Sequence, residues 1–334
     1  MTTDDDYWNG SRYDASSSEG HYESWFLRAN DAGGRAFWIR YTIFAPKHGP
    51  RDAVGELWAI VFDRARDDDR RVVPAKQVHA MTECSFARDR LAVTIGAAKL
   101  DATTLVGSAS ANGHTIAWDL QYGGGGPPLL LLPERLYTMK LPRAKALVNR
   151  PLATFSGTIT VDGEPLTIDS WVGSQNHNWG SRHTDRYAWG QVAGFDERPD
   201  AFLECSTARL KLGPVMTPPM SPVVLRLGDE VLGYNGLTRA ARALGAYAPY
   251  QWHIETTDRQ HGTLDIRIHA DPADFVALRY ANPPGGTKIC LNSKVARCEL
   301  TLRRPDKLPL VLHSSRAAFE IVDDTAPPGI TPAV

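Results

Sequence analysis

The stretch GSQNHNWGSRH, residues 173–183, brings together residue types that can do acid–base and cation chemistry. It holds two histidines, two asparagines, a glutamine and a tryptophan, and strand-like sequence flanks it on both sides. Imidazole moves protons readily near neutral pH, and an indole ring stabilises a nearby positive charge. His177 and Trp179, two positions apart, are therefore the first candidates for catalysis.

A carboxyl group lies two strand-like segments further on, where Glu204 sits among the apolar residues of AFLECST. Burial raises the pKa of a carboxyl group, so Glu204 can stay protonated near neutral pH and act as an acid. Protonation of a carbon–carbon double bond creates a carbocation, which needs such an acid, a dry cavity and aromatic faces. We assign proton donation to Glu204 and its orientation or reprotonation to His177. Trp179 and Trp189 would stabilise the cation.

The amide side chains near these residues allow two interpretations. Asn176, Asn178 and Gln191 can hold a water molecule beside the reacting carbon. Alternatively, Asn176, Asn178 and Ser181 only satisfy backbone groups where two domains meet, as such residues do in turns. We favour the second interpretation for these three residues and a functional role for His177 and Trp179.

The segments that must position these residues show a hydrophobic period of two, which is typical of strands. Aromatic and β-branched segments such as 21–29, 36–45 and 55–63 alternate with clusters of Gly, Pro, Asn or Asp, and a short helix is expected only near 238–247. The 334 residues exceed one small β domain. The sequence predicts an all-β fold of two consecutive antiparallel barrel or sandwich domains, 1–178 and 179–334, with 173–183 as the corner between them.

Three neighbouring strand-like segments each mix ionisable and large apolar residues on one face. These faces carry His21, Glu23, Trp25 and Leu27; Trp38, Arg40, Thr42 and Phe44; and Glu56, Trp58, Ile60 and Phe62. Such faces can be solvated, with charges beside aromatic rings. Alternatively, Arg40 pairs with Glu23 or Glu56 inside an apolar cavity, and three adjacent strands of this kind favour that arrangement.

The chain resembles the AttH and carotenoid 1,2-hydratase (hydroxyneurosporene synthase) family in five segments that occur in the same order. They are GHYESWFLRA, RAFWIRYTIF, GELWAIVFD, FSGTITVDGEPLTIDSWVGSQNHNWG and YAWGQVAGFDE. The resemblance covers most of the chain and is weakest after residue 215. It implies two consecutive lipocalin-like β domains. For the hydratases, it implies proton-initiated addition of water to a terminal isoprenoid double bond.

The family's Asp-His-x-Trp-Gly signature is met here with Asn176 in place of the aspartate, so His177 and Trp179 match its His-x-Trp pair. Its Tyr-x-Asp pair corresponds to Phe202-x-Glu204, which keeps an acid and loses the phenol. This departure leaves the substrate open and retains acid chemistry. Related lipocalin-like proteins act as pericyclases on polyenes, so the fold alone does not decide the reaction.

Composition and motifs argue against several other classes. Lys plus Arg number 37 against 38 for Asp plus Glu, a balance that gives no field to attract nucleic acid. The longest apolar run, PPLLLLP, is too short to span a bilayer. Nucleotide-binding and G-x-S-x-G motifs are missing, and His177, His183 and Asp185 lack metal-ligand spacing, so we expect no metal and no organic cofactor. Cysteines without C-x-x-C spacing and an acidic N-terminus predict a cytoplasmic location.

These observations favour a cofactor-independent, hydratase-like lyase or cyclase that uses acid catalysis on a carbon–carbon double bond of an isoprenoid or polyene. Carotenoid or terpenoid secondary metabolism would supply such a substrate. A Diels–Alderase-like pericyclase acting on a polyene and a non-catalytic lipocalin-like carrier are the alternatives. If Glu204 and His177 face one apolar pocket, the enzyme is favoured, whereas a solvent-exposed Glu204 favours the carrier.

The expected partner is an apolar small molecule, and a homodimer is one option for the oligomeric state. The residues predicted to bind the substrate, besides the catalytic three, are Glu23, Trp25, Trp38, Arg40, Glu56, Trp58, Asn176, Tyr187, Trp189, Gln191 and Phe202.

Overall fold

Short helices are a minor part of the computed structural model, which describes residues 4–47, 49 and 52–334. The helices are α1 (Asp4–Asn9) and α2 (Leu237–Arg242), with single 3-10 turns at Met81–Glu83, Glu134–Tyr137 and Pro272–Asp274. The helix expected at 238–247 is therefore confirmed in its first half only, because the chain from Leu244 onward forms a strand. The first three residues of the acidic N-terminal stretch lie outside the described residues.

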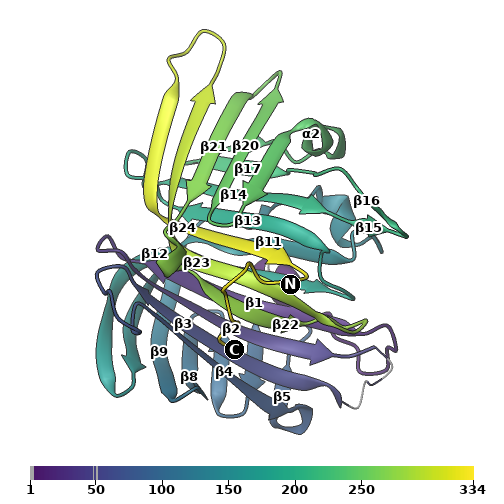
Figure 1. Ribbon diagram of the computed structural model, residues 1–334, viewed down its shortest axis with the longest axis vertical. Coiled ribbons are helices and arrows are strands. Elements are labelled where there is room, and N and C mark those ends of the chain that lie inside the picture. Colours follow the sequence, from purple (N-terminus) through teal and green to yellow (C-terminus); the bar gives the residue numbers. More distant parts are fainter. Residues whose placement is uncertain (1–3, 48, 50–51) are drawn as a thin grey trace.

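The first half of the chain forms one antiparallel sheet, in which β10 joins the side of β11 and the other strands follow the order β4-β3-β2-β1-β12-β11-β9-β8-β7-β6-β5. The sheet curls so that β4 packs against β8 and β9 (Figure 1). Its strands are β1 (His21–Asn30), β2 (Arg35–Ala45), β3 (Val54–Asp63), β4 (Val72–Ala80), β5 (Cys84–Phe86), β6 (Ala92–Ile95), β7 (Ala98–Asp101), β8 (Thr104–Ala111), β9 (His114–Gly124), β10 (Leu129–Leu130), β11 (Ala144–Val161) and β12 (Glu164–Gly180).

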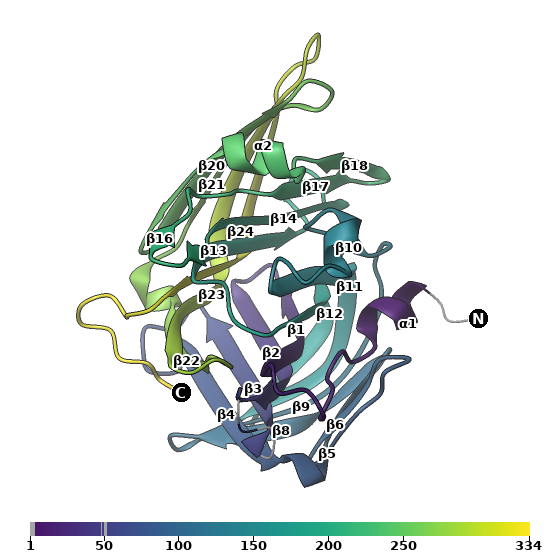
Figure 2. The same cartoon turned by 90° about the vertical axis from the view of Figure 1, so that its right-hand side faces the viewer.

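The second half forms another antiparallel sheet in the order β18-β17-β14-β13-β24-β23-β21-β20-β19, with β22 on the side of β23. Its strands are β13 (Arg186–Ala193), β14 (Ala201–Arg209), β17 (Val223–Leu227), β18 (Glu230–Gly233), β19 (Leu244–Ala248), β20 (Gln251–Asp258), β21 (Gly262–His269), β22 (Val276–Ala281), β23 (Thr287–Arg303) and β24 (Leu310–Asp323). A separate ribbon pairs β15 (Lys211–Leu212) with β16 (Val215–Met216). Figure 2 shows the two sheets stacked, the second above the first.

Each sheet encloses its own apolar core, and a third apolar layer lies where the two sheets meet. Strand β23 packs against β1, β2 and β3 in this layer. One face of β1 to β3 therefore lines the first core, and the other face meets the second sheet. This arrangement explains why nearly every residue of these three strands is buried, where a sheet with one wet face would alternate.

The stretch 173–183 is mostly strand, so its prediction as a corner is wrong. Strand β12 runs to Gly180 and pairs with both β1 and β11 along the whole polar segment. Gly173 is required there, because a Cβ atom would overlap the carbonyl oxygen of Arg28 in β1. The chain turns only at residues 181–185. The predicted domain boundary after residue 178 stays a prediction; strands of the first sheet end at Gly180, and those of the second begin at Arg186.

The predicted all-β fold of two consecutive domains is confirmed, with one sheet and one apolar core in each half of the chain. Within the described part of the chain, no helix is long and apolar enough to cross a membrane.

Candidate active site

The first sheet separates the predicted catalytic residues onto two sides. Successive side chains of a strand point to opposite faces, and His177 lies opposite Trp25 of β1, whose ring is part of the first core. Its neighbour Asn176 points the other way and contacts Gln191 of the second sheet. Glu204, in β14, lies on that same side, between the sheets. His177 and Glu204 therefore do not face one pocket.

His177 has a partner at each ring nitrogen and is fully buried. Its Nδ1 lies 2.7 Å from the carbonyl oxygen of Trp8, and its Nε2 lies 2.8 Å from Oε1 of Glu23. A carbonyl only accepts, so Nδ1 carries a proton. The ring stacks on Trp25 at 4.9 Å and contacts Trp179 at 4.7 Å between centroids.

Besides His177, three groups contact the carboxylate of Glu23. Its carboxylate accepts hydrogen bonds from the Ser11 hydroxyl at 2.9 Å and from the backbone N–H of Arg12 at 2.8 and 3.0 Å. His21 approaches it at 3.0 Å through Nε2. Burial alone would raise the pKa of Glu23, but the hydrogen bonds and charges of His177 and His21 lower it to about 2. Glu23 is thus a buried carboxylate ion.

We term His177, Glu23 and their partners the His177–Glu23 cluster. Its hydrogen bonds hold residues 8–13 against the first sheet. Trp25 donates its indole N–H to the carbonyl of Asn9, and the side-chain amides of Asn9 and Gln175 pair with each other. The Trp179 ring packs with Trp8 and Tyr137 under the same segment. The cluster is therefore closed by the chain itself, and its groups hold the N-terminal segment.

Glu204 is buried between the two sheets. Its Oε1 accepts the indole N–H of Trp189 at 2.7 Å, and its Oε2 accepts the amide of Gln191 at 2.8 Å. Burial raises the pKa of Glu204 to about 7, although these two hydrogen bonds and the charge of Arg28 act in the opposite direction. Glu204 therefore exchanges a proton near neutral pH.

Gln191 connects Glu204 to the first sheet. Its Oε1 accepts hydrogen bonds from Arg28 Nε at 2.8 Å and from the Ser174 hydroxyl at 2.6 Å, and its Nε2 also donates to Asn176 at 2.8 Å. Burial lowers the pKa of Arg28 to about 9, which still leaves it charged at neutral pH. These bonds fix the position of the Gln191 amide and, with it, one oxygen of Glu204.

A further pair of ionisable side chains lies near Trp189. The ammonium group of Lys294 in β23 pairs with Oε1 of Glu320 in β24 at 2.8 Å, and both side chains also contact Asn292. The same ammonium lies 5.7 Å from the ring centroid of Trp189 and 5.5 Å from that of Trp38. Burial lowers the pKa of Lys294. Trp189 therefore lies near both Glu204 and the Lys294–Glu320 pair.

The predicted pairing of Arg40 with Glu23 or Glu56 is wrong. Glu23 lies on the other face of the first sheet, and Glu56 binds Lys76 at 2.9 Å and accepts the Trp58 indole N–H at 3.1 Å. Arg40 donates from Nε to the Ser24 hydroxyl at 2.9 Å. Its guanidinium lies 4.8 Å from the Tyr280 ring centroid, with Trp38 and Trp58 at 5.8 and 6.0 Å. Aromatic rings therefore surround it in place of a carboxylate.

The period-two pattern could not show which face of a strand lies in which layer of the fold. The predicted binding residues therefore lie in different parts of the structure. Glu23 and Trp25 belong to the His177–Glu23 cluster. Phe202 packs in a small apolar group with Leu129 and Val148 beside the sheets' contact. The residues found between the sheets are Trp38, Arg40, Glu56, Trp58, Asn176, Tyr187, Trp189, Gln191 and Glu204, and we term these, with Arg28, Tyr280, Lys294 and Glu320, the inter-sheet cluster.

Sequence reasoning missed the last four members of this cluster. A signal was present for Lys294, which alternates with Asn292 and Cys290 inside the apolar segment ICLNSKVARCEL. Polar residues at every second position of an otherwise buried strand indicate a shared, internally satisfied face. Glu320 stands alone in AAFEIV, and only the pairing of β23 with β24 shows its partner.

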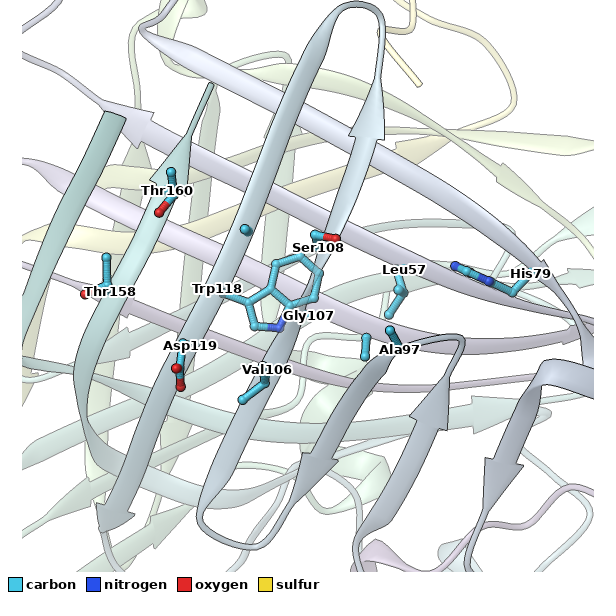
Figure 3. Close-up of a pocket in the computed structure, with 12 residues that line it drawn as sticks. Leu57, His79, Ala97, Val106, Gly107, Ser108, Trp118, Asp119, Thr158 and Thr160 are labelled. Atoms are coloured by element: carbon cyan, nitrogen blue, oxygen red, sulfur yellow. The ribbon is translucent and has the colours of Figure 1, made fainter. Parts of the chain in front are cut away.

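The first sheet also has a cavity of about 410 Å³ away from both clusters. Figure 3 shows Trp118 at its centre, with Thr158 and Thr160 on one side and Leu57 and His79 on the other. No member of either cluster lines this cavity. Within the described residues, no group of three or more His, Cys, Asp or Glu could hold a metal ion. The inter-sheet cluster, which contains the buried carboxyl group of Glu204, is the candidate active site.

Comparison with known proteins supports the fold. No family model matches the chain. An uncharacterized protein of Mycobacterium tuberculosis, Rv0493c, is 26% identical over 288 residues, which cover 85% of this chain and 82% of that protein. An AttH-like protein from Nitrosomonas europaea has a similar structure, with a TM-score of 0.58 and 12% identity over 92% of this chain and 94% of its own.

Two further solved structures share the architecture. Kievitone hydratase from Nectria haematococca gives a TM-score of 0.54 at 14% identity and covers 92% of this chain and 89% of its own. CghA gives 0.53 at 13% identity over 95% of both chains. At these identities the likeness establishes the lipocalin-like all-β fold across both halves of the chain.

Proposed function

We propose that this chain is a cofactor-independent lyase or cyclase of the hydratase type, which protonates a carbon–carbon double bond of an isoprenoid or polyene. Glu204 is the proton donor. The observation that carries the proposal is its position: a fully buried carboxyl group between two sheets, held at both oxygens and able to exchange a proton near neutral pH. The presence of a hydratase among proteins of this fold agrees with this chemistry.

The surroundings of Glu204 suit the two states that the reaction requires. Before transfer, burial keeps the proton on the acid. After transfer, the carboxylate accepts the N–H groups of Trp189 and Gln191, and Arg28 stabilises its charge through Gln191. Trp189 and Trp38 belong to the apolar layer between the sheets, and their ring faces would stabilise a carbocation formed beside Glu204.

His177 has a different role in this proposal from the one its sequence suggested. Both of its ring nitrogens are engaged on the far side of the first sheet, so it positions the N-terminal segment and β12. Trp179 packs beneath that segment. Acid catalysis therefore depends on Glu204 and its partners in the second sheet.

The test is isotope incorporation from solvent. The purified protein is incubated with a panel of isoprenoids and polyenes in D₂O or H₂¹⁸O, and the products are analysed by mass spectrometry. We expect one deuterium at the protonated carbon, one ¹⁸O for hydration and none for cyclisation. Glu204→Gln should lower the rate by about two to four powers of ten. The matched control Glu255→Gln, at an exposed position of β20, should leave it unchanged.

Shape-driven cyclisation without proton transfer is the second candidate. CghA has been solved with Sch210972 bound, so a fold of this kind can hold a small organic ligand. The aromatic rings of Trp38, Trp58 and Tyr280 would supply the surface against which a polyene folds. Turnover that survives Glu204→Gln and leaves products free of deuterium would select this candidate over acid catalysis.

A further inference from the structure

Together with Lys76, the inter-sheet cluster holds four cationic side chains against three carboxyl groups, which are Glu56, Glu204 and Glu320. Glu320 is paired with Lys294 and Glu56 with Lys76, while Arg28 faces Glu204 through Gln191. Arg40 is buried and has no carboxylate partner among the described residues. An isolated charge taken out of water is costly unless an opposite charge accompanies it.

The guanidinium of Arg40 has unused donors. Only its Nε donates to a protein group in the described part of the chain, to the hydroxyl of Ser24. The indole N–H of Trp38, whose ring lies beside Arg40, is buried and also without an acceptor. Buried donors normally find acceptors. The buried, unpaired indole N–H of Trp38, beside the guanidinium of Arg40, therefore indicates a place for an acceptor at this point of the layer.

The groups around Arg40 are neutral, so they do not supply the missing charge. Tyr280 lies under the guanidinium, and the ring of His183 stacks on Tyr22 at 4.0 Å. Burial, with the charge of Arg40, lowers the pKa of His183 to about 3, so this imidazole is uncharged. Tyr187, which interacts electrostatically with Arg40, is half-buried and marks where the cluster approaches the surface.

This excess charge also bears on the proposed chemistry. A carbocation formed near Arg40 and Lys294 is repelled by both. A substrate that brings its own negative charge removes that repulsion and satisfies the free donors of Arg40. The aromatic walls of Trp38 and Trp58 then contact the apolar part of the same molecule.

We propose that Arg40 forms an anion-binding subsite that takes a planar oxyanion, either a carboxylate or an acidic enol, at one end of an otherwise apolar substrate. This inference rests on the proposed function only in placing the substrate in the inter-sheet cluster. Trp38 adds a hydrogen bond to the oxyanion, and Tyr280 fixes the guanidinium plane. The substrate class becomes a polyene or isoprenoid acid rather than a neutral hydrocarbon.

Binding, measured without turnover, tests the subsite. Quenching of tryptophan fluorescence gives the dissociation constants of retinoic acid, of a polyenoyl 3-acyltetramic acid and of retinol, which represent carboxylate, acidic enol and neutral head group. The wild type should prefer at least one acid over retinol by about ten- to a hundredfold, as expected of a charge-assisted hydrogen-bonded pair. The acid that is preferred identifies the head group.

Arg40→Gln should remove this preference and leave the affinity for retinol unchanged, whereas the control Arg267→Gln, an exposed arginine in β21, should retain it. Arg40→Lys keeps the charge and should retain part of the preference for the acids. It is used in place of Arg40→Gln if thermal unfolding shows that Arg40→Gln does not fold. Equal binding of acids and alcohol by the wild type, or equal losses for both in Arg40→Gln, would overturn the subsite. Glu204→Gln should keep the acid preference while losing turnover, so failure of either proposal is recognised separately.

Discussion

Replacing His177 by alanine is expected to loosen the N-terminal segment and lower the free energy of unfolding. The ring is fully buried and bonds both to Trp8 and to Glu23, so its loss leaves Glu23 as a buried carboxylate short of a partner. Removing one member of a buried ion pair costs about 3–5 kcal/mol. The lost stacking on Trp25 adds to this.

The pH dependence follows from the depressed pKa of Glu23. Its pKa is about 2 in the folded protein against an ordinary value of 4.5. The carboxylate therefore stabilises the fold fully above pH 4.5, and this contribution is lost as the pH falls from 4.5 to 2. The shift corresponds to about 3 kcal/mol. Glu23→Gln should lack this acid-sensitive part of the stability.

Urea unfolding gives the free energies, and hydrogen exchange of residues 8–13 reports on the segment. His313→Ala is the matched control, because His313 forms an exposed pair with Glu197 and such pairs contribute at most about 1 kcal/mol. The reasoning fails if His177→Ala unfolds within about 1 kcal/mol of the wild type while turnover drops by two or more powers of ten. That result would return His177 to the catalytic site.

Three other predictions concern the fold and the inter-sheet cluster. The free energy of unfolding of Glu204→Gln should rise above that of the wild type by up to about 3 kcal/mol between pH 4.5 and pH 8. The reason is the raised pKa of Glu204, which makes its ionisation in the folded state unfavourable as the pH rises through 7. A stability difference in urea unfolding that does not change with pH would contradict this. Gly173→Ala should lower the free energy of unfolding by about 3 kcal/mol or more, because the added Cβ would overlap the backbone of β1. The control Gly123→Ala in β9 places its Cβ in open space and should change stability by less than about 0.5 kcal/mol. Similar melting temperatures for both variants would refute the close strand contact. Lys294→Met and Glu320→Met should each lower the free energy of unfolding by about 3–5 kcal/mol. The double variant should lose far less than the sum of these two values, because the two groups form a pair. A double-mutant cycle without coupling would show that they are not paired.

Periodicity was sufficient to predict the strands and the two-domain β fold. The period-two faces of β1 to β3 were correct as sets, with Glu23 and Trp25 on one face of the sheet and Arg40 and Trp58 on the other. The sequence could not show which face meets which layer, because both faces are buried and both carry aromatic residues. The Arg40 pairing failed for this reason.

The polar stretch 173–180 misled the prediction because its partners are distant in sequence. Residues that look like turn formers satisfy one another across strands, as Asn176 does with Gln191 and Ser174 does with the same amide. Lys294 and Glu320 likewise meet only through the register of β23 and β24. The burial of Glu204 could be predicted from the sequence because one property, an acid inside an apolar strand, is local.

The most direct test of the account is the ionisation of Glu204 itself. The protein is labelled with [5-¹³C]glutamate, and the carboxyl resonance that Glu204→Gln removes is followed from pH 4 to pH 9. We predict a midpoint near 7, as burial between the sheets requires of a proton donor at neutral pH. A midpoint near the ordinary value of 4.5 would contradict the assignment of Glu204 as the acid.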